Sequence, residues 1–468
     1  MSEALNTGSH DLPVTEELAA FMRTGWAGGT PPGTAPVTAR PIAPWAAKRR
    51  TALAQRFPGE RLVIPAGTLK VRSNDSDYRF RPHSAYSYLT GAHESDDVLV
   101  IEPSGEAVLY VRPRAPREEG QEFYRDRRYG EFWAGPRPDL AEAAELYQVE
   151  CAHIRDLDLE RPARVLRGVD AAVDARVPRG GDDRDAELET HLAEMRLVKD
   201  EWEVGELQSA VDATVRGFED VVRALPQAFG HARGERYLEG VFGLRARLEG
   251  NAVGYDSIVA AGSHACVLHW IRNDGALDRG DLLLLDAGVE TDTLYTADVT
   301  RTFPMSGRFG SVQRQAYELV YEAQTAAIAT LRPGARFRDF HLAAMRVICD
   351  GLRDWGLLKD STDTLMETGL YRRYTLCSSG HMLGLDVHDC ARSRAEVYLD
   401  GVLAEGQVLT VEPGLYFQPD DLTLPEELRG MGIRIEDDLV VTADGATLMS
   451  AGLPRHPDEV ESWMGALL

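Results

Sequence analysis

Four carboxylates and one imidazole in the second half of the chain have the residue types and local settings of a metal site. They are Asp286 in LLLLDAGVE, Asp298 in YTADVTRTFP, His381 in SSGHMLGLDVHD, Glu412 in LTVEPGLYF and Glu436 in GIRIEDDLV. Four carboxylates that share one buried site repel one another and raise each other's pKa values unless positive charge compensates them. Two divalent cations would supply that charge, and a metal pair also suits hydrolysis. The residues therefore predict a dinuclear metal site that performs hydrolysis.

The local sequence predicts that strands carry these acids. Asp286 follows four leucines, as a residue at the end of a buried strand would, although a lone aspartate there is more often a turn or cap residue. Arg434 and Glu436 lie on one face by strand alternation, so the arginine either orients a ligand carboxylate or forms a plain ion pair. A Pro-Gly turn directly after Glu412 would fix that side chain at a strand end.

The histidines and their neighbours limit which kinds of metal site or nucleophile the sequence can provide. No HExxH motif occurs, and His381 and His388 are too far apart to form one on a helix. A single imidazole among carboxylates favours manganese, with zinc and cobalt as alternatives. Residue type alone leaves His269 open between a buried core histidine and a catalytic residue. The serines beside His381 form no GxSxG motif, and a nucleophilic Cys377 is the weaker hypothesis, so neither nucleophile is favoured.

The composition limits the partners and the compartment. A chain of 468 residues with 44% hydrophobic and 27% charged residues is ordinary for a globular protein of two or three domains. A net charge of −24 argues against nucleic acid or an anionic membrane as a partner. Five scattered cysteines without a CxxC pair favour a reducing compartment. With no signal-peptide pattern and no apolar run long enough to span a bilayer, we expect a cytoplasmic protein.

Composition also predicts the organisation along the chain. Residues 1–44 are rich in Gly, Pro and Thr and predict a flexible N-terminal extension. Residues 45–180 mix helical and β-like runs and predict a smaller α/β domain. A segment dense in charge and glycine predicts a linker over 181–195. Residues 196–468 then form an α+β domain in which strands carry the acidic residues.

Helical periodicity is clearest in that second domain. Apolar residues from Leu207 to Val221 recur at helical spacing, and Pro226 is expected to end this helix. Two more helices are expected over 311–331 and 338–355.

The five acidic and histidine segments resemble the pita-bread metallopeptidases, and most specifically the aminopeptidase P family. The segment RSNDSDYRFRPHSAYSYLTG also resembles the first domain of that family. The resemblance covers roughly residues 45–465. It implies an α+β protein with a C-terminal pita-bread (creatinase/aminopeptidase-like) catalytic domain and a smaller α/β creatinase-like N-terminal domain.

The resemblance implies removal of the N-terminal residue from peptides with proline in second position, through a hydroxide bridging two divalent metals, typically manganese. Asp286 would chelate one metal, and Asp298 and Glu436 would bridge both. His381 and Glu412 would bind the other metal, and Glu412 would also accept a proton during catalysis.

Further roles follow from the same resemblance. His269 and His388 would orient the substrate and stabilise the tetrahedral intermediate, and Arg434 would support the ligand shell. Cys377 and Tyr416 would contribute to substrate binding. The resemblance also implies a homodimer or a homotetramer.

Three features depart from the family pattern. The family usually has a histidine in an HGxxH pattern where this chain has CSSGH, so Cys377 replaces an imidazole with a poorer hydrogen-bond partner. Ser87 stands at the place of a tryptophan. Asp286 and Asp298 are 12 residues apart, one more than expected. None of the three removes a metal ligand.

Two alternative functions stay open. A proline dipeptidase (prolidase) uses the same metal site on dipeptides, and the sequence does not distinguish a dipeptide substrate from a longer peptide. A weakened or non-catalytic paralogue that acts as a binding module is the alternative from a different class, and Cys377 is the residue that favours it. Creatinase, which shares the fold without metals, is disfavoured because all five ligands are present.

Overall fold

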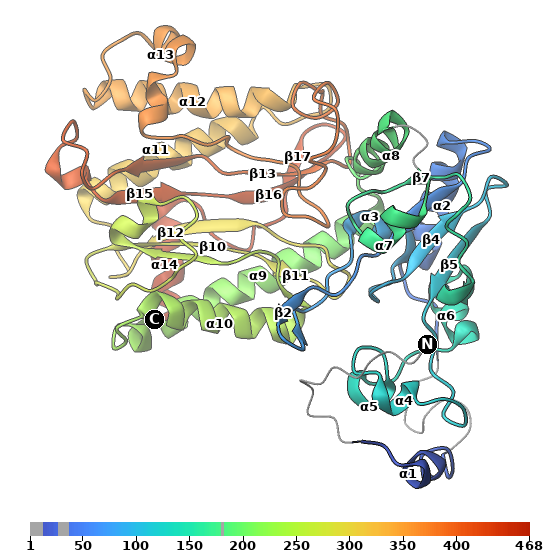
Figure 1. Cartoon of the computed structure of the whole chain (residues 1–468). Coiled ribbons are helices and arrows are strands. Elements are labelled where there is room, and N and C mark those ends of the chain that lie inside the picture. The colour runs from blue at the N-terminus through green and yellow to red at the C-terminus, as the bar shows by residue number, and fades with distance from the viewer. Residues whose placement is uncertain (1–12, 27–36, 179–181) are drawn as a thin grey trace. The chain divides into compact units, whose positions relative to one another are not determined.

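The computed structural model describes residues 13–26, 37–178 and 182–468, and the chain divides into two compact units (Figure 1). The N-terminal unit is Met1–Leu192 and the C-terminal unit is Ala193–Leu468. Both units mix helices with sheets, which confirms the predicted α+β class.

A five-stranded mixed sheet forms the centre of the N-terminal unit, in the order β6-β5-β4-β1-β7. Its strands are β1 (Leu62–Pro65), β4 (Val98–Ile101), β5 (Ala107–Val111), β6 (Glu150–His153) and β7 (Arg164–Val165). β4 pairs antiparallel with β1 and β5, whereas β5–β6 and β1–β7 are parallel. The central strands β1 and β4 are buried along their whole length, which explains their continuous apolar sequences.

The other elements of this unit are short. They are α1 (Glu16–Phe21), α2 (Ala43–Arg56), β2 (Val71–Ser73), β3 (Ser76–Asp77), α3 (Ser84–Thr90), α4 (Glu122–Arg125), α5 (Glu131–Ala134), α6 (Leu140–Tyr147), α7 (Ala171–Arg176) and α8 (Asp182–Glu194).

Two of these helices bear on the predicted domain boundaries. The predicted extension 1–44 contains the short helix α1. The ring of Trp26, in the same segment, packs edge-on against the ring of Phe123, with centroids 5.1 Å apart, because the apolar and aromatic residues of the segment have a surface to bury. The last two residues of the predicted extension already belong to helix α2, and its parts at 1–12 and 27–36 lie outside the described residues. The segment 181–195, predicted as a linker, is largely helix α8, since charged residues at its surface are compatible with a helix.

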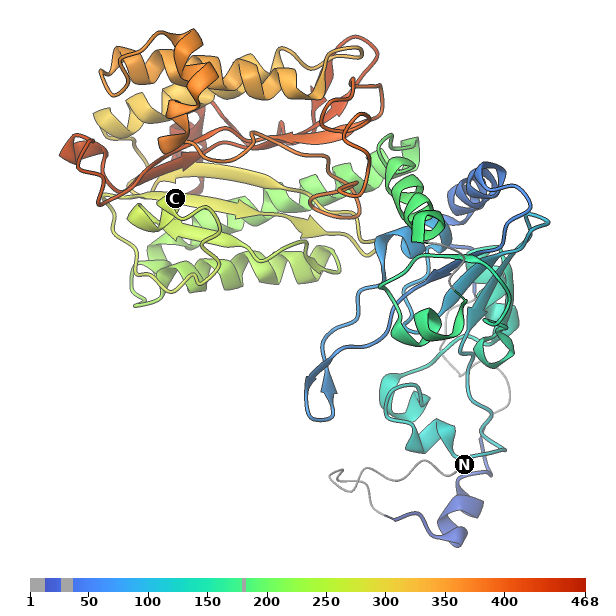
Figure 2. The ribbon, with the colours of Figure 1, turned by 45° about the horizontal axis from the view of Figure 1, so that its top comes forward.

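Antiparallel strands lie between two layers of helices in the C-terminal unit (Figures 1 and 2). One sheet has the order β12-β10-β9 and another the order β13-β16-β17, while β14 pairs with β15 and β8 with β11. The strands are β8 (Ala252–Val253), β9 (Ile258–Ala261), β10 (Leu282–Ala287), β11 (Val289–Glu290), β12 (Val299–Pro304), β13 (Val408–Val411), β14 (Gly414–Phe417), β15 (Met431–Arg434), β16 (Asp437–Val441) and β17 (Ala446–Leu448).

The helices α9 and α10 cover one side of these strands, and α11 and α12 cover the other (Figures 1 and 2). The helices of this unit are α9 (Glu201–Ala228), α10 (Gly234–Glu249), α11 (Ser311–Ile328), α12 (Phe337–Asp354), α13 (Thr362–Thr368) and α14 (Pro457–Leu467). The helices expected over 311–331 and 338–355 are therefore confirmed to within a few residues. Within the described part of the chain, none of the helices has the length and apolar character needed to cross a bilayer.

The expectation that Pro226 ends its helix is wrong. Proline lies inside α9, which continues to Ala228 with Phe229 as its C-cap. Proline has no backbone N–H, so one helical hydrogen bond is lost, and its ring disfavours the preceding turn. The cost is small because the proline lies in the last turn of the helix. Packing of its apolar face outweighs the local preference, since Val221, Val222, Leu225 and Ala228 are all fully buried.

Helices α9 and α10 approach closely at a glycine. Phe218 of α9 and Phe242 of α10 meet edge to face, with ring centroids 6.1 Å apart, and both are fully buried. A Cβ atom at Gly217 would lie 2.6 Å from Cε2 of Phe242, closer than such atoms can approach. Gly217 is therefore needed for the close packing of these helices under the sheet.

We expect Gly217→Ala to destabilise the C-terminal unit by roughly 1–3 kcal/mol, because the added methyl group overpacks the contact with Phe242. Gly205 in the same helix is the matched control, since it is exposed and nothing lies within 4 Å of its Cβ position. Gly205→Ala should be neutral or stabilising by up to about 1 kcal/mol. Thermal unfolding of both variants measures the difference, and equal midpoints would contradict the packing argument.

Candidate metal centre

All the residues singled out from the sequence line one cavity of about 270 Å³ in the C-terminal unit. They are Asp286, Asp298, His381, Glu412 and Glu436, together with His269, His388, Cys377, Tyr416 and Arg434. The rest of the wall includes Tyr255, Asp256 and the apolar residues Ile258, Leu268, Ile271 and Val387. Side chains that are up to 181 positions apart in the chain thus share one cavity.

Strand pairing places three of the acids around Thr300. Asp286 in β10 pairs directly with Thr300 in β12, and Asp298 immediately precedes β12. Glu436, between β15 and β16, forms an isolated bridge with Thr300, and its N–H donates to the Thr300 carbonyl at 3.0 Å. The hydroxyl of Thr300 also donates to Glu436 Oε2 at 2.7 Å. One threonine therefore fixes both the backbone and the side chain of Glu436.

A second pairing positions the other two predicted ligands. The N–H of Thr410, in β13, donates to the His381 carbonyl at 2.8 Å, and the N–H of His381 donates to Thr410 Oγ1 at 3.1 Å. The N–H of Glu412 donates to the Ser379 carbonyl at 2.9 Å. The loop that carries His381 therefore runs beside the end of β13, from which Glu412 projects.

The connection between Asp286 and Asp298 contains a tight turn. The N–H of Thr291 donates to the Tyr295 carbonyl at 2.8 Å, and Leu294 has φ = 72°, a conformation that a branched residue adopts only when packing requires it. Glu290 and Thr296 form a bridge across this turn. The 12-residue interval is thus compatible with both aspartates reaching the cavity.

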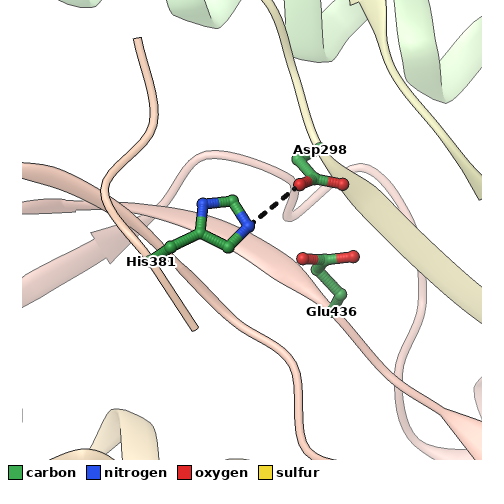
Figure 3. Close-up of side chains that lie close together, drawn as sticks. All are labelled: Asp298, His381 and Glu436. Carbon is green, nitrogen blue, oxygen red and sulfur yellow. Dashed lines mark ion pairs between the residues drawn. The ribbon is translucent and has the colours of Figure 1, made fainter. Parts of the chain in front are cut away.

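Asp298, His381 and Glu436 converge most closely (Figure 3). Each offers one ligand atom, and these atoms lie within 4.8 Å of one another. His381 Nε2 lies 3.2 Å from Asp298 Oδ2 and 3.4 Å from Glu412 Oε1. Glu436 Oε1 is buried and has no hydrogen-bond partner among the described residues. Because buried polar atoms are normally satisfied, this oxygen fits a cation ligand.

The electrostatics of the cluster also fit cations. Burial and the charge of Asp298 raise the pKa of Glu412 to about 7, although the charge of His381 opposes this. Burial, followed by repulsion from the neighbouring carboxylates, raises the pKa of Glu436 well above its usual range. Burial raises the pKa of Asp286 too, and the charge of Arg434 only partly offsets it. Divalent cations would replace the protons that these carboxylates otherwise retain.

The imidazoles differ in protonation. Burial alone would lower the pKa of His381, but the hydrogen bond to Asp298 and the charge of Glu412 outweigh it and raise the pKa to about 9. Burial and the positive charge of His381 lower the pKa of His388, whose ring lies 4.4 Å from that of His381 and nearly perpendicular to it. His388 is therefore neutral at pH 7.

Arg434 contacts one of the predicted ligand carboxylates, that of Asp286. Its Nη2 donates to Asp286 Oδ2 at 2.6 Å, whereas its Nε donates to Thr300 Oγ1 at 3.2 Å. Its Nη1 donates to the Tyr416 hydroxyl at 2.9 Å. The arginine thus orients Asp286 and Tyr416, and it contacts Glu436 only through Thr300.

Two residues of the centre were missed from the sequence. The Tyr255 hydroxyl lies 2.7 Å from Asp286 Oδ1 and 2.6 Å from Asp298 Oδ1, so it joins the two aspartates. Asp438 Oδ2 accepts a hydrogen bond from the N–H of Asp298 at 3.0 Å. Asp438 had a weak signal, since it stands in the acidic IEDD segment, but nothing around Tyr255 distinguishes it from a core tyrosine.

Cys377 lies on the cavity wall and is exposed. Partial burial and the charge of Glu412 raise the pKa of its thiol. The side chain is therefore protonated at neutral pH, which argues against a thiolate nucleophile.

Two family models match the chain. Metallopeptidase family M24 matches residues 205–443, and the aminopeptidase P N-terminal domain matches residues 46–166. An Xaa-Pro aminopeptidase 1 from Streptomyces coelicolor is 57% identical over 465 residues, which covers 97% of this chain and 93% of that protein.

Solved structures give the same relationship. The Pseudomonas aeruginosa aminopeptidase PepP superposes with a TM-score of 0.77 at 31% identity, covering 92% of this chain and 99% of that one. Aminopeptidase P from Escherichia coli, with the inhibitor Pro-Leu, gives a TM-score of 0.77 at 30% identity, covering 90% and 98%.

We expect manganese to raise the thermal midpoint of the chelator-treated protein, because a cation that binds only the folded cluster stabilises it by about 2.7 kcal/mol at 100 times its Kd. Glu436→Ala and His381→Ala should reduce this shift, since each removes a ligand atom. Asp256→Asn is the control, because Asp256 lines the cavity outside the cluster. A full shift in either ligand variant would contradict the placement of the cation.

Proposed function

The chain belongs to metallopeptidase family M24 and carries the N-terminal domain of aminopeptidase P, and from this premise we propose how its cavity works. It is an Xaa-Pro aminopeptidase, a hydrolase that removes the N-terminal residue from peptides with proline in second position. The observation that carries the proposal is the convergence of Asp298, His381 and Glu436 on a cavity that contains the other predicted residues.

We propose that the cluster holds two divalent cations and that manganese is the native metal. An oxygen-rich set with a single imidazole suits manganese, and zinc and cobalt are the alternatives. The ligands would be Asp286, Asp298, His381, Glu412 and Glu436. When bound, the cations would lower the pKa of a water molecule and polarise the scissile carbonyl group.

The protein's own groups would then move protons and orient the substrate. The Glu412 carboxylate would accept a proton from water and return it to the leaving proline nitrogen. Neutral His388 would donate an N–H to the carbonyl oxygen of the substrate, and His269 would orient the peptide from another part of the wall. Arg434 would keep Asp286 and Tyr416 in place.

Recognition of proline would depend on shape. The bond that precedes proline has no N–H, so the enzyme cannot select it with a hydrogen-bond acceptor. Ile258, Leu268, Ile271 and Val387 supply apolar wall against which a pyrrolidine ring can pack.

We also propose the properties that the comparisons leave open. The protein would be cytoplasmic, which the five unpaired cysteines in the described residues support. It would form a homodimer or a homotetramer. The division into 1–44, 45–180, 181–195 and 196–468 would mark an extension, the N-terminal domain, a connecting segment and the catalytic domain, close to the observed division at Leu192.

We expect the manganese-loaded protein to release the first residue from an Xaa-Pro-Xaa tripeptide and to lose this activity on chelation. The matching Xaa-Pro dipeptide separates the proposal from a dipeptidase. Turnover of the dipeptide alone would identify a prolidase, and turnover of neither by folded, metal-loaded protein would indicate a binding module.

The site assignment is tested in the same assay. Asp298→Ala and His381→Ala should abolish hydrolysis while the protein still folds, because each removes a side chain of the central cluster. Asp256→Asn should still bind the metal, because its side chain lies outside the cluster. Full activity in either alanine variant, with metal still bound, would contradict the assignment.

We expect Cys377→His to raise kcat/KM on Xaa-Pro peptides by up to about tenfold, because imidazole forms a stronger hydrogen bond to the substrate than a thiol. Cys377→Ser is the control, since it removes the thiol without adding a ring. A steady-state rate that stays equal or falls in Cys377→His would show that cysteine does not weaken substrate contacts.

A further inference from the structure

One wall of the cavity is an irregular segment, residues 261–275, which we call the wall segment. Leu268, His269 and Ile271 reach the cavity from it. It begins at the end of β9 with a short 3₁₀ turn, Gly262–Cys266, and the remainder has no regular structure. His269 lies in this irregular part, so its placement depends on side chains that anchor the segment.

A single buried carboxylate provides several of these anchors. Glu235, in the first turn of α10, is fully buried, and its Oε1 accepts from the N–H of Ala261 at 2.8 Å and lies 2.7 Å from His264 Nδ1. Its Oε2 accepts from the indole N–H of Trp270 at 2.9 Å and from the N–H of Gly275 at 2.7 Å. One side chain thus bonds to both ends of the wall segment and to two points within it.

The packing around the carboxylate is close. The rings of His264 and Trp270 stack with centroids 3.9 Å apart and planes 22° apart, so the two side-chain donors support each other. A Cβ atom at Gly275 would lie 2.8 Å from Glu235 Oε2 and 2.7 Å from His264 Cε1, so only glycine fits there. A buried carboxylate with four donors, at a helix N-terminus, is stable without a metal or a guanidinium beside it.

Other hydrogen bonds anchor the wall segment at residues other than His269 and its neighbours. The Asn273 side chain bonds to Val259 and Ser257, and the Gln418 amide donates to the Cys266 carbonyl at 2.9 Å. Trp270 directly follows His269 in the chain, so its bond to Glu235 acts one residue from the imidazole.

We propose that Glu235 is a positioning residue, whose carboxylate holds the wall segment so that His269 faces the substrate cavity. Glu235 does not line that cavity, and it acts only through the residues it anchors. The kinetic consequence depends on the proposed peptidase function, whereas the anchoring itself does not.

Glu235→Gln tests the proposal with little change of shape. Its amide –NH₂ would face two of the four donors, so two hydrogen bonds are lost. We expect kcat/KM for Xaa-Pro-Xaa peptides to fall tenfold or more, because small displacements of an orienting group cost that much, with metal content unchanged. Trp270→Phe keeps an aromatic ring at the position and removes one donor, so it should give a smaller loss in the same direction. Glu239→Gln, one turn further along α10, is the control and should leave the rate unchanged.

A double-mutant cycle separates positioning from general destabilisation. In a His269→Ala background, Glu235→Gln should change kcat/KM by less than about threefold, because the group it positions is absent. The same factor in both backgrounds would overturn the proposal. A wild-type protein that cleaves no Xaa-Pro peptide would instead count against the proposed function.

Hydrogen exchange tests the anchoring without activity. In Glu235→Gln, amides of residues 264–273 should exchange faster, while those of β10 and β12 should not change. Unchanged exchange in the wall segment would overturn the proposal, and should Glu235→Gln fail to fold, Trp270→Phe is measured in its place with the same two outcomes.

Discussion

Mutual repulsion among buried carboxylates is the constraint on which the catalytic unit depends. Asp286, Asp298 and Glu436 are each less than 10% exposed, and Glu412 stands beside them. Burial of unpaired charge is costly, and the raised pKa values of three of these acids express that cost. Hydrogen bonds from Tyr255, Thr300 and Arg434 orient the oxygens, yet Glu436 Oε1 keeps no partner among the described residues. The arrangement of these carboxylates therefore fits a binding site for divalent cations.

The surrounding framework holds these side chains against their repulsion. Next to Glu436 in the chain, Asp437 is fully buried and forms an ion pair with Arg301 at 2.6 Å. It also accepts hydrogen bonds from Gln324 at 2.7 Å and from Ser450 at 2.5 Å, which connects α11 to the start of β16. Breaking a buried pair of this kind costs about 3–5 kcal/mol. The network therefore fixes the start of β16, next to Glu436 in the chain. In another part of the cavity wall, hydrogen bonds to the buried Glu235 carboxylate anchor the segment that carries His269.

Each of the five acidic and imidazole positions had a weak signal in the local sequence, and their order along the chain made the combined prediction specific. Four leucines precede Asp286 and a Pro-Gly pair follows Glu412, and the structure places all five residues on one cavity. Tyr255 and Glu235 could not be found in that way, because a single tyrosine between a glycine and an aspartate and a glutamate in a first helical turn are common in any globular protein. Their importance comes from distant partners, which only the folded chain brings together.

The same reason explains the errors in element boundaries. Pro226 is a helix-ending signal in isolation, but the buried residues around it keep α9 helical to Ala228. The segment 181–195, predicted as a linker, contains helix α8, and the division between the two units falls within it at Leu192. Tertiary packing decided each case over local preference.

The most direct test of the central claim is anomalous diffraction from crystals of the manganese-loaded protein. Two anomalous peaks inside the cavity, contacted by oxygens of the four carboxylates and by an imidazole nitrogen of His381, are the predicted result. An active, manganese-dependent protein whose peaks lie outside this cavity, or that shows none, would contradict the account.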